Sequence, residues 1–324
     1  RLRVAQELFA GARRVAALGA GEAARIATGA PVPEGADAVV RVEDTKEDND
    51  IVVISRAARR GESIERAGSD LAKGSVVVRA GEPLTPARLG LLASVGATQV
   101  EVLARPRVAL FTSGDEVVPA GETLAPGQIH DSNGPALTAL LEGAGAEVDA
   151  RPALPDDLAR LADALAGAAR GSDLALLTGG ASVGAKDLVV DALRAKGEVL
   201  FHGVRVKPGK PLLAGRVGDA LVIGLPGNPA SALSNACLFV LPALRRLAGL
   251  PQATGVPVPA TLAQDVAGEP ERYLFLPVRL EDGLARPTFK TSGALTSLAA
   301  SDGWIGVPEG AKLPAGARVD VHPW

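Results

Sequence analysis

The residues best suited to chemistry in this sequence directly follow short apolar runs. Leu174–Leu177 is unbroken and apolar, and the glycine-rich segment Thr178–Asp187 comes immediately after it. Such a run is typical of a strand buried on both faces, and the pattern after Asp187 predicts a helix. Glycines let the backbone approach a ligand, and the free N–H groups of a helix start favour an anion. Alone, this turn is compatible with an anion site and with a plain connection alike.

A second segment strengthens the interpretation as a site. Leu221–Ser231 repeats the order of apolar strand, turn and helix. Because ligands of open parallel sheets bind at the carboxyl ends of the strands, the two turns predict one crevice. The first turn is neither a Walker loop, since no Gly-Lys-Ser/Thr follows it, nor a Gly-x-Gly-x-x-Gly turn, so neither nucleotide motif applies.

Lysines and acidic residues fall at the same predicted edge. Lys207 and Lys210 lie in a Lys-Pro-Gly-Lys-Pro turn after another strand, and Asp131 and Asp187 each precede a predicted helix. Lysines and backbone donors suit pyrophosphate and other oxyanions, and carboxylates suit Mg²⁺. Each carboxylate alone is better explained as a helix cap, so the predicted site depends on the combination.

The elements that must position these residues alternate between strand and helix over residues 106–250. Strands are predicted at Val108–Phe111, Glu147–Arg151, Leu174–Leu177, Val199–Val206 and Ala220–Leu225. This order predicts a multidomain α/β plus β protein whose central domain is a doubly wound, mainly parallel sheet with helices on both faces.

The flanking regions have a different character. Residues 1–80 read as a β-rich domain, with short runs such as Ala38–Val42 and Ser75–Arg79 predicted as strands. Residues 81–105 form a helix–strand connector, with a helix from Thr85 and a strand at Val100–Leu103. Residues 251–324 begin with a proline-rich linker and predict a small C-terminal β domain resembling a barrel.

Composition excludes several classes of protein. The net charge of −3 gives no basic surface for nucleic acid. A single cysteine, Cys237, cannot form an internal disulfide, and with three histidines it supplies no zinc motif. No segment is long and apolar enough to cross a membrane, and no signal peptide is visible, so the cytoplasm is the default location.

The motifs resemble those of the molybdopterin molybdenumtransferase family, which includes bacterial MoeA and the gephyrin E domain. The matching segments are Gly179–Gly184, Lys207–Pro211, Pro226–Ser231, Thr28–Asp37, Thr112–Glu116 and His130–Asn133. The α/β segment alone also resembles molybdopterin adenylyltransferases, but the flanking β regions favour the molybdenumtransferase. The resemblance covers the whole chain.

The resemblance implies an activity in molybdenum cofactor biosynthesis. Members of the family insert molybdenum from the substrate molybdate into adenylated molybdopterin, with Mg²⁺-dependent release of AMP. It also implies a homodimer, with the upstream molybdopterin adenylyltransferase as a further candidate partner. A catalytically weak molybdopterin-binding or scaffold protein of the same fold remains the alternative.

The resemblance also implies roles for individual residues. The catalytic residues would be Asp131, Asp187, Lys207 and Lys210, of which Asp131 and Asp187 would hold the metal. The substrate-binding residues would be Gly179, Gly180, Ser182, Gly184, Pro226, Gly227, Asn228, Ser231, Arg272 and Ser292, together with Asp70, supplied across the dimer.

Family members carry a further N-terminal stretch that includes an Ala-Met-Asp-Gly turn. This sequence has no such turn and no methionine. We therefore expect an N-terminally incomplete chain that inserts molybdenum poorly. In it, residues 81–105 would be the remnant of an elongated domain, with Leu89, Leu91 and Leu92 partly exposed.

Overall fold

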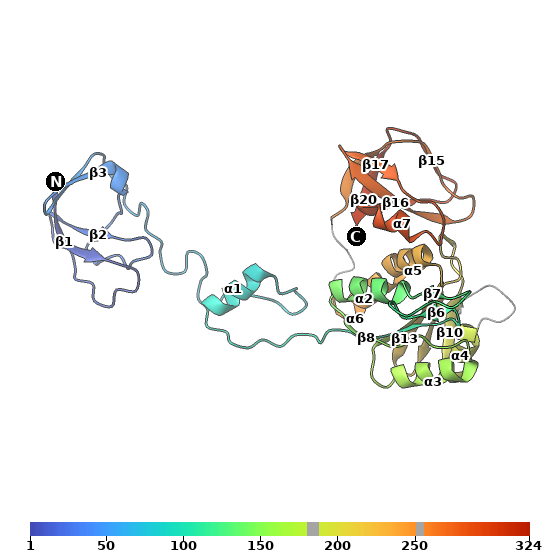
Figure 1. The fold of residues 1–324 in the computed structure, drawn as a ribbon. Helices are drawn as coiled ribbons and strands as arrows, with labels where there is room; N and C mark the ends of the chain where they lie inside the picture. Colours follow the sequence, from blue (N-terminus) through green and yellow to red (C-terminus); the bar gives the residue numbers. More distant parts are fainter. Residues whose placement is uncertain (180–187, 251–255) are drawn as a thin grey trace. The chain divides into compact units, whose positions relative to one another are not determined.

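The computed structural model describes residues 1–179, 188–250 and 256–324 of the chain. The described chain divides into two compact units, Arg1–Arg79 and Ala80–Trp324. Figure 1 shows their elements, coloured along the sequence. The predicted fold class is confirmed, since a β-rich N-terminal region, an α/β sheet and a small closed β barrel follow one another along the chain.

The N-terminal unit contains a four-stranded sheet with the order β2-β1-β4-β3. Its strands are β1 (Leu2–Leu8), β2 (Glu22–Ile26), β3 (Thr45–Asp48) and β4 (Ile51–Ile54), and a 3-10 turn covers Val42–Asp44. β1 is parallel to β2 and antiparallel to β4, which forms a hairpin with β3. Side chains along β1 alternate between exposed and partly buried, as expected for a strand with one solvated face.

Three apolar runs that the sequence predicts as strands are irregular in the structure. They are Ala38–Val42, Ser75–Arg79 and Val100–Leu103. In the first, the Val39 N–H donates to the Glu62 carbonyl at 2.9 Å, in a loop. In the last, Leu103 is 68% exposed. A strand needs a neighbour to pair with, and β2 forms by pairing along β1 although Glu22, Ala23 and Ala24 are weak strand formers.

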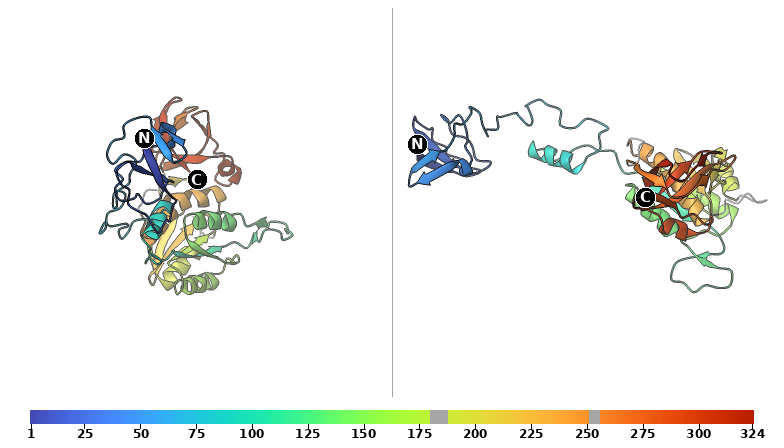
Figure 2. Two further views of the ribbon diagram at one scale, coloured as in Figure 1. Left: turned by 90° about the vertical axis from the view of Figure 1, so that its left-hand side faces the viewer. Right: turned by 90° about the horizontal axis from the view of Figure 1, so that it is seen from above.

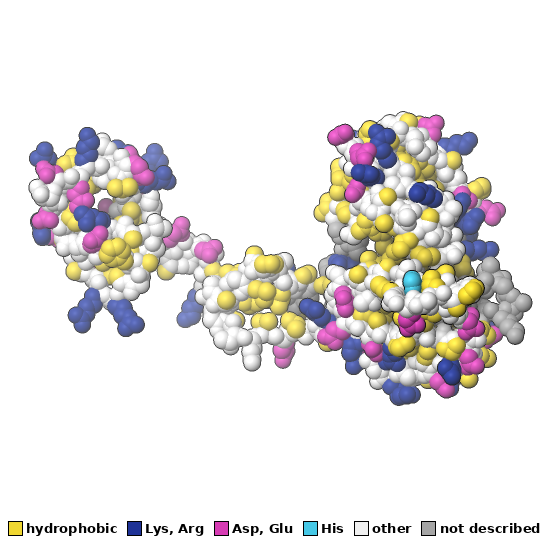
Figure 3. Space-filling model, in the orientation of Figure 1, with side chains coloured by type: hydrophobic (Ala, Val, Ile, Leu, Met, Phe, Trp, Pro, Cys, Tyr) yellow, Lys and Arg dark blue, Asp and Glu magenta, His cyan; other side chains and the backbone are white. Residues whose placement is uncertain are grey.

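Helix α1 (Pro86–Ser94) begins as its sequence predicts. Thr85 is the N-cap, and its hydroxyl accepts a hydrogen bond from the Arg88 N–H at 3.3 Å. None of the helix residues is buried, and Leu89 is 50% exposed. Figure 3 shows hydrophobic side chains gathered over this segment.

The second unit contains a six-stranded sheet with the order β10-β12-β13-β9-β5-β8. Its strands are β5 (Arg107–Thr112), β8 (Glu147–Ala150), β9 (Leu174–Thr178), β10 (Glu198–His202), β12 (Leu213–Val217) and β13 (Ala220–Leu225). β13, β9, β5 and β8 run parallel, whereas β12 is antiparallel to both of its neighbours. Every residue of β9 is buried, as the unbroken apolar run predicts for a central strand.

Helices cover both faces of this sheet (Figure 1). They are α2 (Asn133–Gly143), α3 (Leu158–Ala168), α4 (Leu188–Lys196), α5 (Pro229–Asn235) and α6 (Leu241–Leu247), with a π-helical turn, Ala236–Val240, between the last two. α3 and α4 share one apolar layer with the sheet, and α2, α5 and α6 share the other. Among the described helices, none combines the length and apolar character needed to span a bilayer.

The last part of the unit is a small barrel. It consists of β14 (Val258–Leu262), β16 (Tyr273–Glu281), β17 (Leu284–Pro287), β18 (Gly303–Val307) and β20 (Arg318–Pro323), with helix α7 (Leu295–Ala299) and the pair β15 (Val266–Ala267) and β19 (Lys312–Leu313). The barrel closes because β16 pairs with both β17 and β18. Strand β11 (Val206–Lys207), which lies between β10 and β12 in the chain, pairs in parallel with β16. The lysine turn is therefore attached to the barrel as well as to the α/β sheet.

Candidate functional site

A cavity of ≈ 390 Å³ lies at the carboxyl ends of β5, β9 and β13. The start of α2 and the short strands β6 (Val117–Val118) and β7 (Ile129–His130) also line it, and Figure 2 shows this segment projecting from the α/β layers. This is the edge at which open parallel sheets bind ligands. The predicted site residues that line the cavity are Asp131, Gly179, Pro226, Gly227 and Asn228.

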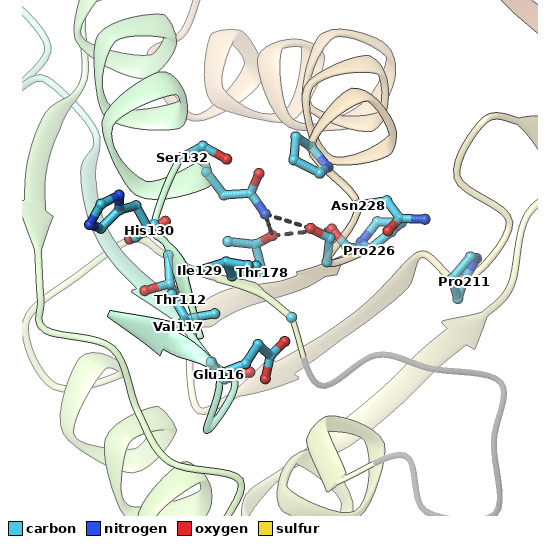
Figure 4. Close-up of a pocket in the computed structure, with 16 residues that line it drawn as sticks. Thr112, Glu116, Val117, Ile129, His130, Ser132, Thr178, Pro211, Pro226 and Asn228 are labelled. Atoms are coloured by element: carbon cyan, nitrogen blue, oxygen red, sulfur yellow. Dashed lines mark hydrogen bonds between the residues drawn. The ribbon is translucent and has the colours of Figure 1, made fainter. Parts of the chain in front are cut away.

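Asn133 connects three elements around this cavity. Its Nδ2 atom donates to Thr178 Oγ1 at 3.0 Å and to the Gly227 carbonyl at 2.8 Å. The Thr178 hydroxyl in turn donates to the Pro226 carbonyl at 3.1 Å. Figure 4 shows these bonds, which join the end of β9, the start of α2 and the turn after β13. The network ties the end of β9 to the turn after β13.

Two further hydroxyl groups, those of Thr112 and Ser113, are buried at the end of β5. Thr112 Oγ1 and Ser113 Oγ line the same cavity and have no hydrogen-bond partner within the described part of the chain. Both residues are only 4% exposed. An unpaired buried hydroxyl lowers stability, so a polar group that reached these atoms would relieve that cost.

Gly179, directly after β9, lies close to Ser113 at the end of β5. Its φ of +97° is unfavourable for residues with a side chain. A Cβ atom at this position would also come within 2.0 Å of the Ser113 carbonyl oxygen. Glycine is thus required here on both conformational and steric grounds.

Asp131 acts as a helix cap and also lines the cavity. Its Oδ1 atom accepts a hydrogen bond from the Gly134 N–H at 2.9 Å, at the start of α2. Mg²⁺ takes one or two carboxylates and completes its shell with water and substrate phosphates, and one carboxylate at an open cavity fits that pattern. Within the described ranges no group of three or more acidic, histidine or cysteine residues is gathered, so they offer no closed metal cage.

A second cavity of ≈ 420 Å³ adjoins the first, since Pro211, Pro226 and Asn228 line both. Its wall comes partly from the lysine turn and α5 and partly from the barrel region. The predicted site residues on this wall are Lys207, Lys210, Pro226, Asn228, Ser231, Arg272 and Ser292. The structure therefore brings the described members of the predicted set, apart from Asp70, to two neighbouring cavities.

Buried polar side chains of α5 hold the lysine turn. Asn235 Nδ2 donates to the Gly209 carbonyl at 2.7 Å, and the Ser234 hydroxyl donates to the Pro208 carbonyl at 3.3 Å. Gly209 has a φ of +111°, and a Cβ atom there would lie 2.5 Å from Asn235 Nδ2. The backbone between the two lysines is thereby fixed.

The second cavity is strongly basic. Four of the described side chains that line it are cationic, namely Lys207, Lys210, Arg272 and Lys290. Glu269 Oε1 accepts from Lys207 Nζ at 2.6 Å, and its Oε2 lies 3.4 Å from Arg272 Nη2. The Lys207 hydrogen bond holds the pKa of Glu269 below its usual value. Such a set of donors suits a small oxyanion.

Ser292 joins the barrel region to the turn after β13. Its hydroxyl accepts from Asn228 Nδ2 at 3.0 Å, and its carbonyl accepts from the Ala230 N–H at 3.1 Å. These bonds place the Lys290–Ser292 segment beside the start of α5. Both cavities therefore have walls that are hydrogen-bonded together across the sequence.

The remaining predicted residues cannot be placed in these cavities. Gly180, Ser182, Gly184 and Asp187 lie outside the described residues. Asp70 is an exposed residue of the N-terminal unit. Its predicted role across a dimer stays a prediction.

Two charged residues at the second cavity, Lys290 on its wall and Glu269 behind two of its cations, were not identified from the sequence. Lys290 lines the cavity two positions before Ser292, and Glu269 precedes Arg272 by three positions. Their closeness in sequence to Ser292 and Arg272, which the family resemblance identifies, was the available indication that they belong to the site. Neither lies in a glycine-rich turn or at the end of a predicted strand. A search for polar residues at the ends of predicted strands therefore could not find them.

Comparison with known proteins matches three successive parts of the chain. Residues 109–246 match a probable molybdopterin binding domain, residues 2–96 the MoeA N-terminal region (domains I and II), and residues 259–324 the MoeA C-terminal region (domain IV). Two solved structures of the molybdopterin biosynthesis MoeA protein from Pyrococcus horikoshii have TM-scores of 0.81 and 0.83 at 37% and 29% identity. They cover 100% and 99% of this chain and 82% and 81% of their own.

Curated relatives agree with these matches. Molybdopterin molybdenumtransferase from Staphylococcus aureus (strain MSSA476) is 33% identical over 93% of this chain and 73% of its own. Molybdopterin molybdenumtransferase 2 from Mycobacterium tuberculosis is 41% identical over 77% of this chain. The chain belongs to the MoeA family. It spans 63% of the length of the M. tuberculosis relative.

Proposed function

We propose that this protein is a molybdopterin molybdenumtransferase, which inserts molybdenum from molybdate into adenylated molybdopterin and releases AMP. The observation that carries the proposal is the pair of adjoining cavities that share Pro211, Pro226 and Asn228. One offers unpaired hydroxyls and a carboxylate, and the other offers four cationic side chains. The curated relatives are named molybdopterin molybdenumtransferases, which supports the transfer of molybdenum to molybdopterin.

The first cavity would bind adenylated molybdopterin. The hydroxyls of Thr112 and Ser113 donate to its polar groups, and Asn133 holds the surrounding turns in position. Asp131, with Asp187 as the second predicted ligand, would hold Mg²⁺. When bound, Mg²⁺ supplies positive charge that stabilises the pyrophosphate and the departing AMP.

The second cavity would bind molybdate beside that substrate. Lys207, Lys210, Arg272 and Lys290 attract the dianion, and the hydroxyl of Ser292 is a further donor on the same wall. The two anions then lie on opposite sides of the wall that the cavities share. Holding two reactants in neighbouring sites lowers the entropic part of the barrier to their reaction.

The proposed assembly is a cytoplasmic homodimer in which Asp70 of each protomer reaches the partner's cavity. The upstream molybdopterin adenylyltransferase would supply the adenylated substrate. Family membership supports this arrangement. Sedimentation at micromolar concentration should give twice the chain mass, and a monomer would contradict the arrangement.

The reaction is tested by mixing the purified protein with adenylated molybdopterin. AMP release should require both molybdate and Mg²⁺, and the pterin product should carry molybdenum. Binding of both substrates without AMP release would instead identify the protein as a molybdopterin-binding or scaffold protein of this fold.

A further inference from the structure

Glu269 stands out among the charged groups around the second cavity. It contacts two cations that line the cavity, through its two different oxygen atoms: Lys207 Nζ at 2.6 Å and Arg272 Nη2 at 3.4 Å. Glu269 itself is not one of the lining residues. A carboxylate that bridges two guanidinium or ammonium groups limits their freedom and partly neutralises them.

The backbone around Glu269 fixes this bridge. Glu269 and Arg272 face each other across a short turn, and the Glu269 carbonyl accepts from the Gly310 N–H at 2.7 Å. Directly after Arg272, Tyr273 pairs with Val206 of β11, the neighbour of Lys207. All three charged residues are therefore anchored to one strand pair of the barrel.

The other two cations of the cavity differ from this pair. Lys210 and Lys290 line it, yet no carboxylate of the described chain lies within 4.0 Å of either ammonium group. Among the described residues, the cavity thus has two cations held by an internal anion and two without such a partner.

We propose that Glu269 is a built-in counter-ion of this cavity, which positions Lys207 and Arg272 and lowers the affinity for the incoming oxyanion. The inference rests on the proposed function, in which the cavity binds molybdate. An oxyanion that binds there competes with Glu269 for the same donors and is repelled by its charge. Without this carboxylate the four cations would hold a dianion more tightly and release it more slowly.

The test compares Glu269→Gln with a matched control, Glu271→Gln. Glutamine keeps the length of the side chain and removes its charge, and Glu271 is an exposed carboxylate two positions away. Calorimetric titration with molybdate, and separately with sulfate, gives the dissociation constants at one ionic strength. We expect Glu269→Gln to bind molybdate about 3- to 10-fold more tightly than the wild type, and Glu271→Gln to change the affinity less than about 2-fold.

The outcomes separate this inference from the proposed function. Equal or weaker binding by Glu269→Gln, or an equal gain in both variants, overturns the counter-ion role even where the wild type inserts molybdenum. Tighter anion binding by Glu269→Gln alone sustains it even where no AMP is released. In an active enzyme the variant should lower KM for molybdate without raising kcat, which a purely structural role of Glu269 would not produce.

Discussion

Thr112 and Thr178 form a matched pair for measuring how much the hydrogen-bond network contributes to the free energy of unfolding. They are register partners on β5 and β9, and both are at most 4% exposed. Thr178 Oγ1 has partners at 3.0 and 3.1 Å, whereas Thr112 Oγ1 has none among the described residues. Replacement by valine keeps the branched shape and removes the hydroxyl, so the two variants differ mainly in the hydrogen bonds lost.

The expected magnitudes follow from these contacts. Thr178→Val loses two hydrogen bonds worth about 1 kcal/mol each and leaves the buried Pro226 carbonyl without that donor, so the free energy of unfolding should fall by about 2–3 kcal/mol. Thr112→Val removes a hydroxyl that is buried without a partner. Its free energy of unfolding should stay unchanged or rise by up to about 1 kcal/mol.

Urea titration followed by tryptophan fluorescence measures both changes. Trp304 and Trp324 belong to the same compact unit as the two threonines, so their emission reports the unfolding of that unit. Equal loss of stability in the two variants would refute the assignment of partners. Thr112→Val should also bind adenylated molybdopterin about tenfold more weakly, because the ligand then loses a donor.

Three further substitutions, with Gly203→Ala as a control for one of them, test the proposed site. Asp131→Asn should keep the helix cap and change the free energy of unfolding by less than about 0.5 kcal/mol. It should nevertheless reduce Mg²⁺-dependent AMP release at least about tenfold, and unchanged release would remove Asp131 from the metal site. Lys210→Ala should weaken molybdate binding more at low than at high salt in calorimetric titrations, because salt screens charge attraction; affinities equal to the wild type at every salt concentration would contradict its role. Gly209→Ala should lower the free energy of unfolding by about 2–4 kcal/mol, from its φ of +111° and the contact with Asn235. Gly203→Ala, with a φ of +89° but its nearest neighbour at 3.9 Å, should cost only about 1 kcal/mol in the same urea titration, and equal losses would show that the Asn235 contact is relieved.

The central part of the fold was predictable because burial on both faces leaves a clear pattern. The apolar runs of β9 and β13 are strands at the middle of the sheet, and Gly179 after β9 and Pro226–Pro229 after β13 line the first cavity. The glycine at position 179 also has a physical reason, because a Cβ atom there would collide with the Ser113 carbonyl oxygen. Where a residue is dictated by burial or by backbone approach, the sequence carries the information.

Strand β12 shows why other elements were missed. Its sequence contains Gly215 and the exposed Arg216, which weaken a strand pattern. In the structure, a Cβ atom at Gly215 would lie 2.3 Å from the Glu198 carbonyl oxygen of β10. The glycine is needed for this contact, but the contact depends on a pairing that the local sequence does not reveal.

The charged residues of the second cavity show the same limitation. Lys290 and Glu269 lie in barrel segments with no distinctive spacing. Lys290 lines the cavity and Glu269 contacts two of its cations because β11 pairs with β16 and Ser292 bonds to the turn after β13. Their positions at the cavity are set by pairing between segments that are far apart in the sequence. Motif reasoning could find the lysine turn but could not find the groups that neutralise or extend it.

The pairing of β11 with the barrel also sets an order of events during synthesis of the chain. Lys207 leaves the ribosome 62 positions before Glu269, and Asn228 leaves it 64 positions before Ser292. A nascent chain that has reached only α6 possesses the lysine turn but neither its counter-ion nor the barrel side of the cavity. The second cavity therefore acquires its full lining only after the barrel segments that carry Arg272, Lys290 and Ser292 have been synthesised.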